Sequence, residues 1–336
     1  MSSVALVMIA RDEERCIGRA LASAAPYVDR MLVLDTGSTD DTVAIARAAG
    51  AIVDRAEWRD DFAAARNAAL AMSDAAYNLM LDADEWIESG GPDLRAWCTT
   101  SSATLGLITR RDVLTAASGI LGDVEAVEPQ VRVLKRGVGY IGRVHEQPDS
   151  LGPVDSLDLV IGHDGYLDEH NAAKAGRNES LLRLQMRDSA DPVLTFQLAR
   201  DLEIQGRFEE AVSYYSQALT EMAHGAPLRH TLVVRAIFSF KSAGRHEEAM
   251  SLFAREAARW PDSPDLFFAA GDLFLDAAVA RPASADEFLT RAKLCWSRCL
   301  ELGDRPELAG SVRGRGSHLA RHNLDVLQQH WPGAGT

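Results

Sequence analysis

The chain has few cysteines, no long apolar run and no excess of basic residues, and each absence excludes a class of protein. Its 336 residues contain four cysteines, without the paired spacing of a zinc site or a disulfide framework, so a reducing cytoplasm is the expected compartment. No apolar stretch approaches the roughly 18 residues that span a bilayer. A formal net charge of −14 argues against a nucleic-acid partner, which needs a basic surface.

Two halves with different patterns make up the sequence. Up to about residue 166, short apolar runs alternate with helical segments, which predicts an α/β fold with a mostly parallel sheet and helices on its faces. The expected strands cover residues 4–10, 30–35, 51–55 and 77–81. Helices are expected over 11–25 and 60–73, and a turn followed by a helix over 37–50. The remainder is nearly all helical. We therefore predict an α/β domain over 1–167, a linking helix over 168–190 and an all-α domain over 191–330.

The helical half contains an internal repeat. "GRFEEAVSYYSQAL", which begins at Gly206, matches "GRHEEAMSLFAREA", which begins at Gly244, in the register of its glycine, alanine and aromatic positions. Small residues where helices touch, followed one turn later by an aromatic residue, resemble tetratricopeptide repeats. A third, degenerate unit is expected over residues 265–302.

A cluster of acidic residues follows the fourth expected strand. "LMLDADEW" places Asp82 and Asp84 two residues apart, so their side chains point the same way if the extended backbone continues. Adjacent carboxylates repel one another, and a divalent cation such as Mg²⁺ or Mn²⁺ is the usual reason to tolerate them. A solvated loop is the alternative. Trp86, directly after the acids, can stack on a sugar or pack in the interior.

A second acidic residue is expected at the same edge of the sheet. Asp35 ends the second expected strand, as Asp82 follows the fourth. Ligands of open α/β sheets bind at the carboxyl ends of the strands. Both residues are therefore candidates for a binding site.

Three sequence blocks together resemble a known family. "ARDEERCIGRALASAAPYVDRMLVLDTGSTDDT", "FAAARNAAL" and "NLMLDADEW" occur in the order and spacing of glycosyltransferase family 2, which has the GT-A fold. The resemblance covers roughly the first 90 residues. With the repeats that follow, the architecture is similar, more loosely, to peptide S-glycosyltransferases of the sublancin type.

The resemblance implies roles for residues that match the family's motifs. The Asp82-Ala83-Asp84 segment would be the DxD motif, which holds a metal on the diphosphate of a nucleotide sugar. Asp35 would contact the base or ribose, and Arg11 and Arg66 would lie near the nucleotide and its phosphates. This agrees in kind with the residues, because carboxylates bind ribose hydroxyls and arginines bind phosphate.

Two further roles are implied near the end of the α/β half. Glu146, after a glycine-containing loop, would be the general base, and His163 would complete the metal site. His145 and Asp164 are rivals for these two roles.

The resemblance implies a metal-dependent, inverting hexosyltransferase that uses Mn²⁺ or Mg²⁺ and a UDP-linked sugar. Its acceptor would be a peptide, a protein or a glycan, and a homodimer is plausible for the family. The alternative is a scaffold that binds proteins through its helical repeats and carries a degenerate catalytic domain.

Overall fold

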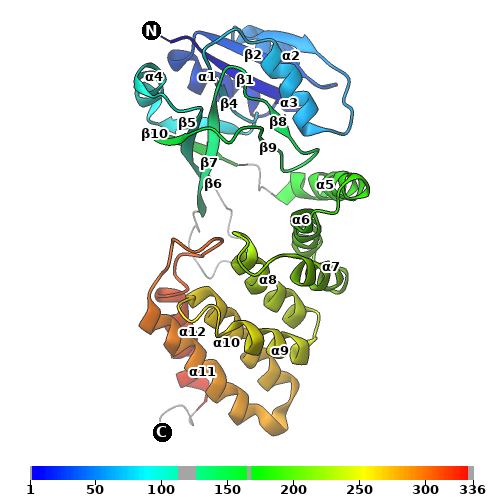
Figure 1. The fold of residues 1–336 in the computed structure, drawn as a ribbon, viewed down its shortest axis with the longest axis vertical. Coiled ribbons are helices and arrows are strands. Elements are labelled where there is room, and N and C mark those ends of the chain that lie inside the picture. The colour runs from blue at the N-terminus through cyan, green and yellow to red at the C-terminus, as the bar shows by residue number, and fades with distance from the viewer. Residues whose placement is uncertain (1, 113–125, 165–167, 332–336) are drawn as a thin grey trace. The chain divides into compact units, whose positions relative to one another are not determined.

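A computed structural model describes residues 2–112, 126–164 and 168–331 (Figure 1). The chain divides into two compact units, Met1–Leu181 and Leu182–Thr336. The boundary falls inside helix α5 (Asp168–Asp188), in the segment predicted as a linking helix. The predicted domain limits themselves stay predictions.

A mixed sheet forms the frame of the first unit. Its strands are β1 (Val4–Ala10), β2 (Arg30–Asp35), β3 (Ile52–Arg55), β4 (Tyr77–Met80), β5 (Glu85–Ser89), β6 (Leu105–Asp112), β7 (Ala126–Lys135) and β10 (Val154–His163). Within the described residues their order is β3-β2-β1-β4-β7-β6-β10-β5. Apart from this sheet, β8 (Tyr140–Ile141) pairs with β9 (Gln147–Pro148).

The predicted α/β fold class is confirmed: the sheet is mixed and mostly parallel, and β6 and β10 also pair in parallel. Strands β1 to β4 pair in parallel, as expected of strands joined by helices. Strand β7 runs antiparallel to β4 and β6, and β5 runs antiparallel to β10. The sequence predicted the first four strands, and the other strands of the sheet follow them along the chain.

Helices cover both faces of the sheet. These helices are α1 (Ile17–Ala24), α2 (Thr42–Ala48), α3 (Phe62–Ala71) and α4 (Gly91–Thr100). Because side chains alternate along a strand, Leu6 and Met8 of β1 share a core with α1, α2 and α4, whereas Ala5 and Val7 share a core with α3. Strand β1 is thus covered on both sides, which explains its unbroken apolar run.

The prediction of a helix from residue 11 is wrong in extent, because α1 begins at Ile17. The three residues after Arg11 form a loop whose backbone N–H groups donate to side chains in the loop after β2 and at the first residue of α2. These bonds are Asp12 to Ser38 Oγ (2.9 Å), Glu13 to Thr42 Oγ1 (2.7 Å) and Glu14 to Asp40 Oδ2 (3.1 Å). Two loops at the carboxyl edge of the sheet are thereby fastened together.

Helices make up the second unit. They are α6 (Pro192–Ile204), α7 (Phe208–Glu221), α8 (Arg229–Ser242), α9 (His246–Glu256), α10 (Pro264–Ala280), α11 (Ala285–Leu302) and α12 (His318–His330). Consecutive helices pack as pairs, α6 with α7, α8 with α9 and α10 with α11. Among the described helices, none has the length and apolar character needed to cross a membrane.

The sequence repeat is also a structural repeat. Gly206 and Gly244 end α6 and α8 with φ angles of 73° and 72°. The same hydrogen bond closes each turn, from Arg207 N to Leu202 O and from Arg245 N to Phe240 O, both at 2.9 Å. A left-handed residue followed by this bond is the Schellman motif, which satisfies the last carbonyls of a helix.

Substitution of the repeat glycine tests this cap. Gly244→Ala is expected to lower the free energy of unfolding of the second unit by about 1 kcal/mol, because an L residue resists a left-handed φ. No heavy atom lies within 4 Å of the added Cβ, so the effect is one of backbone alone. Gly225→Ala, equally uncrowded and without a positive φ, should change it by less than about 0.5 kcal/mol. Urea unfolding measures both, and equal effects would contradict the assignment.

Candidate functional site

A cavity of about 630 Å³ opens in the first unit at the carboxyl ends of β1 and β4. Arg11, directly after β1, lines it, as do residues 82–84, which follow β4 after Leu81. Its other walls include parts of β6 and β7, the 144–148 segment and His163. This is the edge at which ligands of open α/β sheets bind.

The acidic cluster forms a tight turn between β4 and β5. Glu85 N donates to Asp82 O at 3.0 Å, and Asp82 N donates to the Glu85 carboxylate at 3.0 Å. Glu85 is therefore a buried structural residue, whereas the Asp82 side chain retains 34% of its exposure. The turn directs Asp82 and Asp84 to the wall of the cavity.

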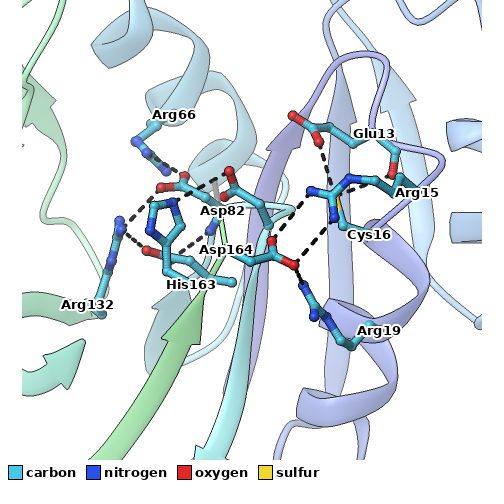
Figure 2. A network of polar contacts seen from close by, with 11 residues as sticks. Glu13, Arg15, Cys16, Arg19, Arg66, Asp82, Arg132, His163 and Asp164 are labelled. Carbon is cyan, nitrogen blue, oxygen red and sulfur yellow. Dashed lines mark hydrogen bonds and ion pairs between the residues drawn. The ribbon is translucent and has the colours of Figure 1, made fainter. Parts of the chain in front are cut away.

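Two buried arginines hold Asp82 (Figure 2). Arg66 of α3 donates to Asp82 Oδ1 at 2.7 Å, and Arg132 of β7 donates to Oδ2 at 3.1 Å and to Glu85 at 2.5 Å. Burial alone would raise the pKa of Asp82, but the two guanidinium charges hold it well below its ordinary value. Burial and the neighbouring Asp82 raise the pKa of Glu85, against the pull of Arg132.

Asp84 and His163 are neighbours in the wall of the cavity. His163 ends β10 and is paired in register with Glu85 of β5. Its Nε2 lies 3.6 Å from Asp84 Oδ2, and both side chains are mostly buried. An imidazole nitrogen and a carboxylate oxygen at this separation can share one divalent ion with ligand distances of about 2.0–2.2 Å.

The described residues do not form a complete metal cage. Among them, no group of three or more His, Cys, Asp or Glu side chains lies close enough to hold an ion. Mg²⁺ and Mn²⁺ sites for nucleotides commonly use one or two protein ligands and take the rest from phosphate and water. Asp84 and His163 fit that donor set, whereas both oxygens of Asp82 are engaged by arginine.

Asp164, the rival metal ligand, is bound elsewhere. Its carboxylate accepts from Arg15 at 3.3 Å and from Arg19 at 2.7 Å. Both arginines lie to the right of Asp164 in Figure 2, away from Arg66 and Arg132. Burial would raise the pKa of Asp164, but these two arginines lower it below its ordinary value. The arrangement anchors the end of β10, and therefore His163, to α1.

The candidate bases lie on the segment between β8 and β9. Glu146 and His145 both line the cavity. Glu146 Oε1 accepts from Arg66 Nε at 2.5 Å, so Arg66 joins Glu146 to Asp82. His145 has a φ of 53°, a conformation that costs a non-glycine residue roughly 1–3 kcal/mol and that concentrates at functional sites.

The remaining predicted site residues lie at different depths. Arg11 lines the cavity with its side chain half exposed. Asp35 is 1% exposed and accepts from Ser38 N at 3.0 Å, with Arg55 at 3.3 Å. It does not line the cavity, although the next residue, Thr36, does.

Trp86 is held by packing. Arg19 lies 3.8 Å from the centroid of its ring. The ring also covers Gly162, where an added Cβ would lie 2.3 Å from it. Trp86 is absent from the cavity lining, which favours the packing interpretation over a sugar-stacking one.

Sequence reasoning missed Arg132 and Tyr140, which line the cavity although both are more than nine-tenths buried. The available signal for Arg132 was weak, a charged residue among the apolar ones of "VRVLK". Tyr140 gave no signal, since a tyrosine near a turn is ordinary. Only the fold brings them to Asp82.

Parts of the chain are similar in sequence to known proteins. Residues 5–91 match the family model described as Glycosyl transferase family 2. The chain is 52% identical over 85 residues to a TPR repeat-containing protein of Synechococcus elongatus, covering 25% of this chain and 21% of that protein. It is 24% identical over 234 residues to the SPbeta prophage-derived glycosyltransferase SunS of Bacillus subtilis, covering 66% of this chain and 54% of SunS.

Among solved structures, the chain is similar to glucosyl-3-phosphoglycerate synthase from Mycobacterium tuberculosis in complex with Mn²⁺, UDP and glucosyl-3-phosphoglycerate. The identity is 27%, the match covers 33% of this chain and 44% of that one, and the TM-score is 0.29. The chain thus spans about half or less of the length of these relatives.

Proposed function

The N-terminal region of this chain belongs to glycosyltransferase family 2, and from that premise we propose that the protein transfers a sugar from a nucleotide-sugar donor to an acceptor. The observation that carries the proposal is the pairing of Asp84 with His163 beside the Arg66–Asp82–Arg132 cluster, at the carboxyl edge of the sheet. Carboxylate, imidazole and guanidinium groups in one cavity suit a metal-bound diphosphate.

The proposed donor site uses each predicted residue. Asp84 and His163 would hold Mn²⁺ or Mg²⁺, and Arg11 and Arg66 would face the phosphates of a UDP-linked sugar. Asp35 would contact the base or ribose. Asp82 would be a further ligand of the ion, because each of its oxygens accepts only one hydrogen bond from an arginine and keeps a lone pair.

The proposed reaction is an inverting hexosyl transfer. A hydroxyl or thiol of the acceptor attacks the anomeric carbon, while the bond from that carbon to the diphosphate oxygen breaks on the opposite face. Glu146 would take the acceptor's proton, a role that its place on the cavity wall supports. A bound metal would supply charge stabilisation for the departing diphosphate.

Peptide, protein and glycan acceptors are the candidate classes. Helical repeats commonly present surfaces that bind polypeptides, which favours a peptide or protein. Cytoplasmic location and a homodimer belong to the same proposal. A binding scaffold with a degenerate catalytic domain is disfavoured, since the acids, His163 and the buried arginines line one cavity.

Calorimetric titration tests the donor site. UDP is expected to bind with a micromolar dissociation constant in the presence of Mn²⁺ and far more weakly after chelation of the metal. Metal-dependent binding of another nucleotide in place of UDP would keep the mechanism and change the donor. If no nucleoside diphosphate binds with or without metal, the transferase proposal fails and the scaffold alternative stands.

A further inference from the structure

The two proposed metal ligands lie at one end of the pairing between β5 and β10. In that pairing Trp86 is opposite Gly162, one residue before His163. Just beyond the paired residues, Asp164 N donates to Asp84 O at a longer 3.4 Å. Within the described residues β5 is the last strand of the sheet, so a partner strand holds it on one side only. The spacing of Asp84 and His163 therefore depends on what fastens this end of the strand pair.

Arg19 of α1 reaches both strands at this point. Its guanidinium lies 3.8 Å from the centroid of the Trp86 ring in β5, a distance at which a cation is attracted to the face of the ring. Its Nη2 donates to Asp164 Oδ2, directly after β10, at 2.7 Å (Figure 2). Charge-assisted hydrogen bonds of this kind are among the stronger ones in proteins. Arg19 thus joins the residue two positions after Asp84 to the residue next to His163.

The Trp86 ring also closes on the backbone of β10. A Cβ added to Gly162 would lie 2.3 Å from the ring, so a larger residue would fit there only if the tryptophan moved. Helix α1 contacts β5 a second time, where Ser23 Oγ accepts from Ile87 N at 2.9 Å. Helix α1 and the two strands are therefore packed together around Trp86.

Arg15, one turn before Arg19, differs from it in what it holds. Arg15 also donates to Asp164, from Nη1 at 3.3 Å and from Nη2 at 3.4 Å, whereas the cation over the Trp86 ring is Arg19. Arg15 fastens the end of β10 by longer bonds, and Arg19 fastens β10 and β5 to each other. The described lining of the cavity includes neither arginine, so neither would touch the donor or the acceptor.

We propose that Arg19 is a positioning residue for the metal site. Through its contacts with both strands it holds Asp84 and His163 at the spacing that one divalent ion requires. This inference rests on the proposed function. Residues behind metal ligands fix the orientation of those ligands, and a site with few protein ligands binds its ion well only if they are held in place beforehand. Loss of Arg19 would leave both ligands in the chain but free to move apart.

Arg19→Met tests the role, because methionine keeps an apolar contact with the ring and removes the charge and the donor. Mn²⁺ is titrated into the full chain at a saturating concentration of UDP, and electron paramagnetic resonance measures the free ion. The dissociation constant for Mn²⁺ should rise about tenfold, a usual effect of losing a residue behind a metal ligand. Because both ligands remain, saturating Mn²⁺ should restore the rate of nucleotide release from the UDP-sugar. A merely structural role would lower that rate at every Mn²⁺ concentration.

Arg95→Met is the matched control. Arg95 of α4 makes two hydrogen bonds of 2.9 Å to Asp29 in the same unit. Its side chain is 32% exposed, against 43% for Arg19. This variant should leave the dissociation constant for Mn²⁺ within about twofold, because exposed ion pairs contribute little.

A double substitution tests the route through Asp164. In a chain that already carries Asp164→Asn, Arg19→Met should raise the dissociation constant for Mn²⁺ by a smaller factor than in the wild type. Two changes that break the same contact do not add. Fully additive effects would show that Arg19 does not act through Asp164.

The outcomes separate this role from the proposed function. If UDP binds with Mn²⁺ but Arg19→Met raises the dissociation constant for Mn²⁺ no more than Arg95→Met does, the positioning role is overturned and the transferase proposal stands. If UDP does not bind, guanosine and thymidine diphosphates take its place in the same titration. If one of these nucleotides binds without taking up Mn²⁺, the metal site and this inference fail together. If none of them binds, the transferase proposal fails as well.

Discussion

Asp84→Ala is expected to lower the rate of sugar transfer about a thousandfold, which corresponds to ~4 kcal/mol of transition-state stabilisation. The Asp84 carboxylate lies 3.6 Å from His163 Nε2, and under the proposed function these two groups hold the ion that stabilises the departing diphosphate. Release of nucleoside diphosphate from the nucleotide sugar measures the rate, with water as the acceptor until another is identified. Mn²⁺-dependent binding of the nucleotide should be lost in parallel.

A matched carboxylate distinguishes this effect from a general loss of charge. Asp74 pairs with Arg30 at the surface, where its side chain retains 74% of its exposure. Asp74→Ala should leave both the rate and the binding within about twofold, because exposed ion pairs contribute little. If Asp84→Ala folds normally and transfers sugar within tenfold of the wild type, Asp84 is not a metal ligand.

Arg229→Met is expected to lower the free energy of unfolding of the second unit by about 3–5 kcal/mol. Arg229 and Glu256 form an ion pair at 2.8 Å, with side chains only 4% and 3% exposed. Arg229 also donates to the carbonyls of Leu219 and Met222 at the end of α7. The substitution leaves a buried carboxylate and these carbonyls without their cation. Urea unfolding followed by circular dichroism measures the loss.

Two further variants show how much of the lost stability comes from the buried position of the ion pair and how much from the loss of a charge alone. Arg229→Met combined with Glu256→Leu should recover part of the stability, because an apolar pair replaces the buried charges, while the Leu219 and Met222 carbonyls still lack their donor. Arg245→Met removes an exposed partner of Glu248 and should cost less than about 1 kcal/mol. A loss below 1 kcal/mol for Arg229→Met would show that Arg259, 3.8 Å from Glu256, takes over the pairing.

The sequence by itself determined the features that depend on neighbouring residues. The first four strands follow from apolar runs, and the 38-residue spacing of Gly206 and Gly244 marks two helix ends with the same left-handed φ. The place of the Asp82-Ala83-Asp84 segment at the carboxyl edge of the sheet follows from its position in the sequence after β4. Each of these depends on chain periodicity or turn chemistry, which act over a few residues.

Only the tertiary structure decided which side chains meet. Arg132 is 50 residues from Asp82 along the chain, yet it binds that carboxylate because β7 lies beside β4 in the sheet. His163 faces Asp84 because β10 runs antiparallel to β5. Helix α1 starts late because backbone donors of its predicted first turn bind the loop after β2. Strand pairing between distant segments is set by packing of the whole sheet, and local sequence patterns do not encode it.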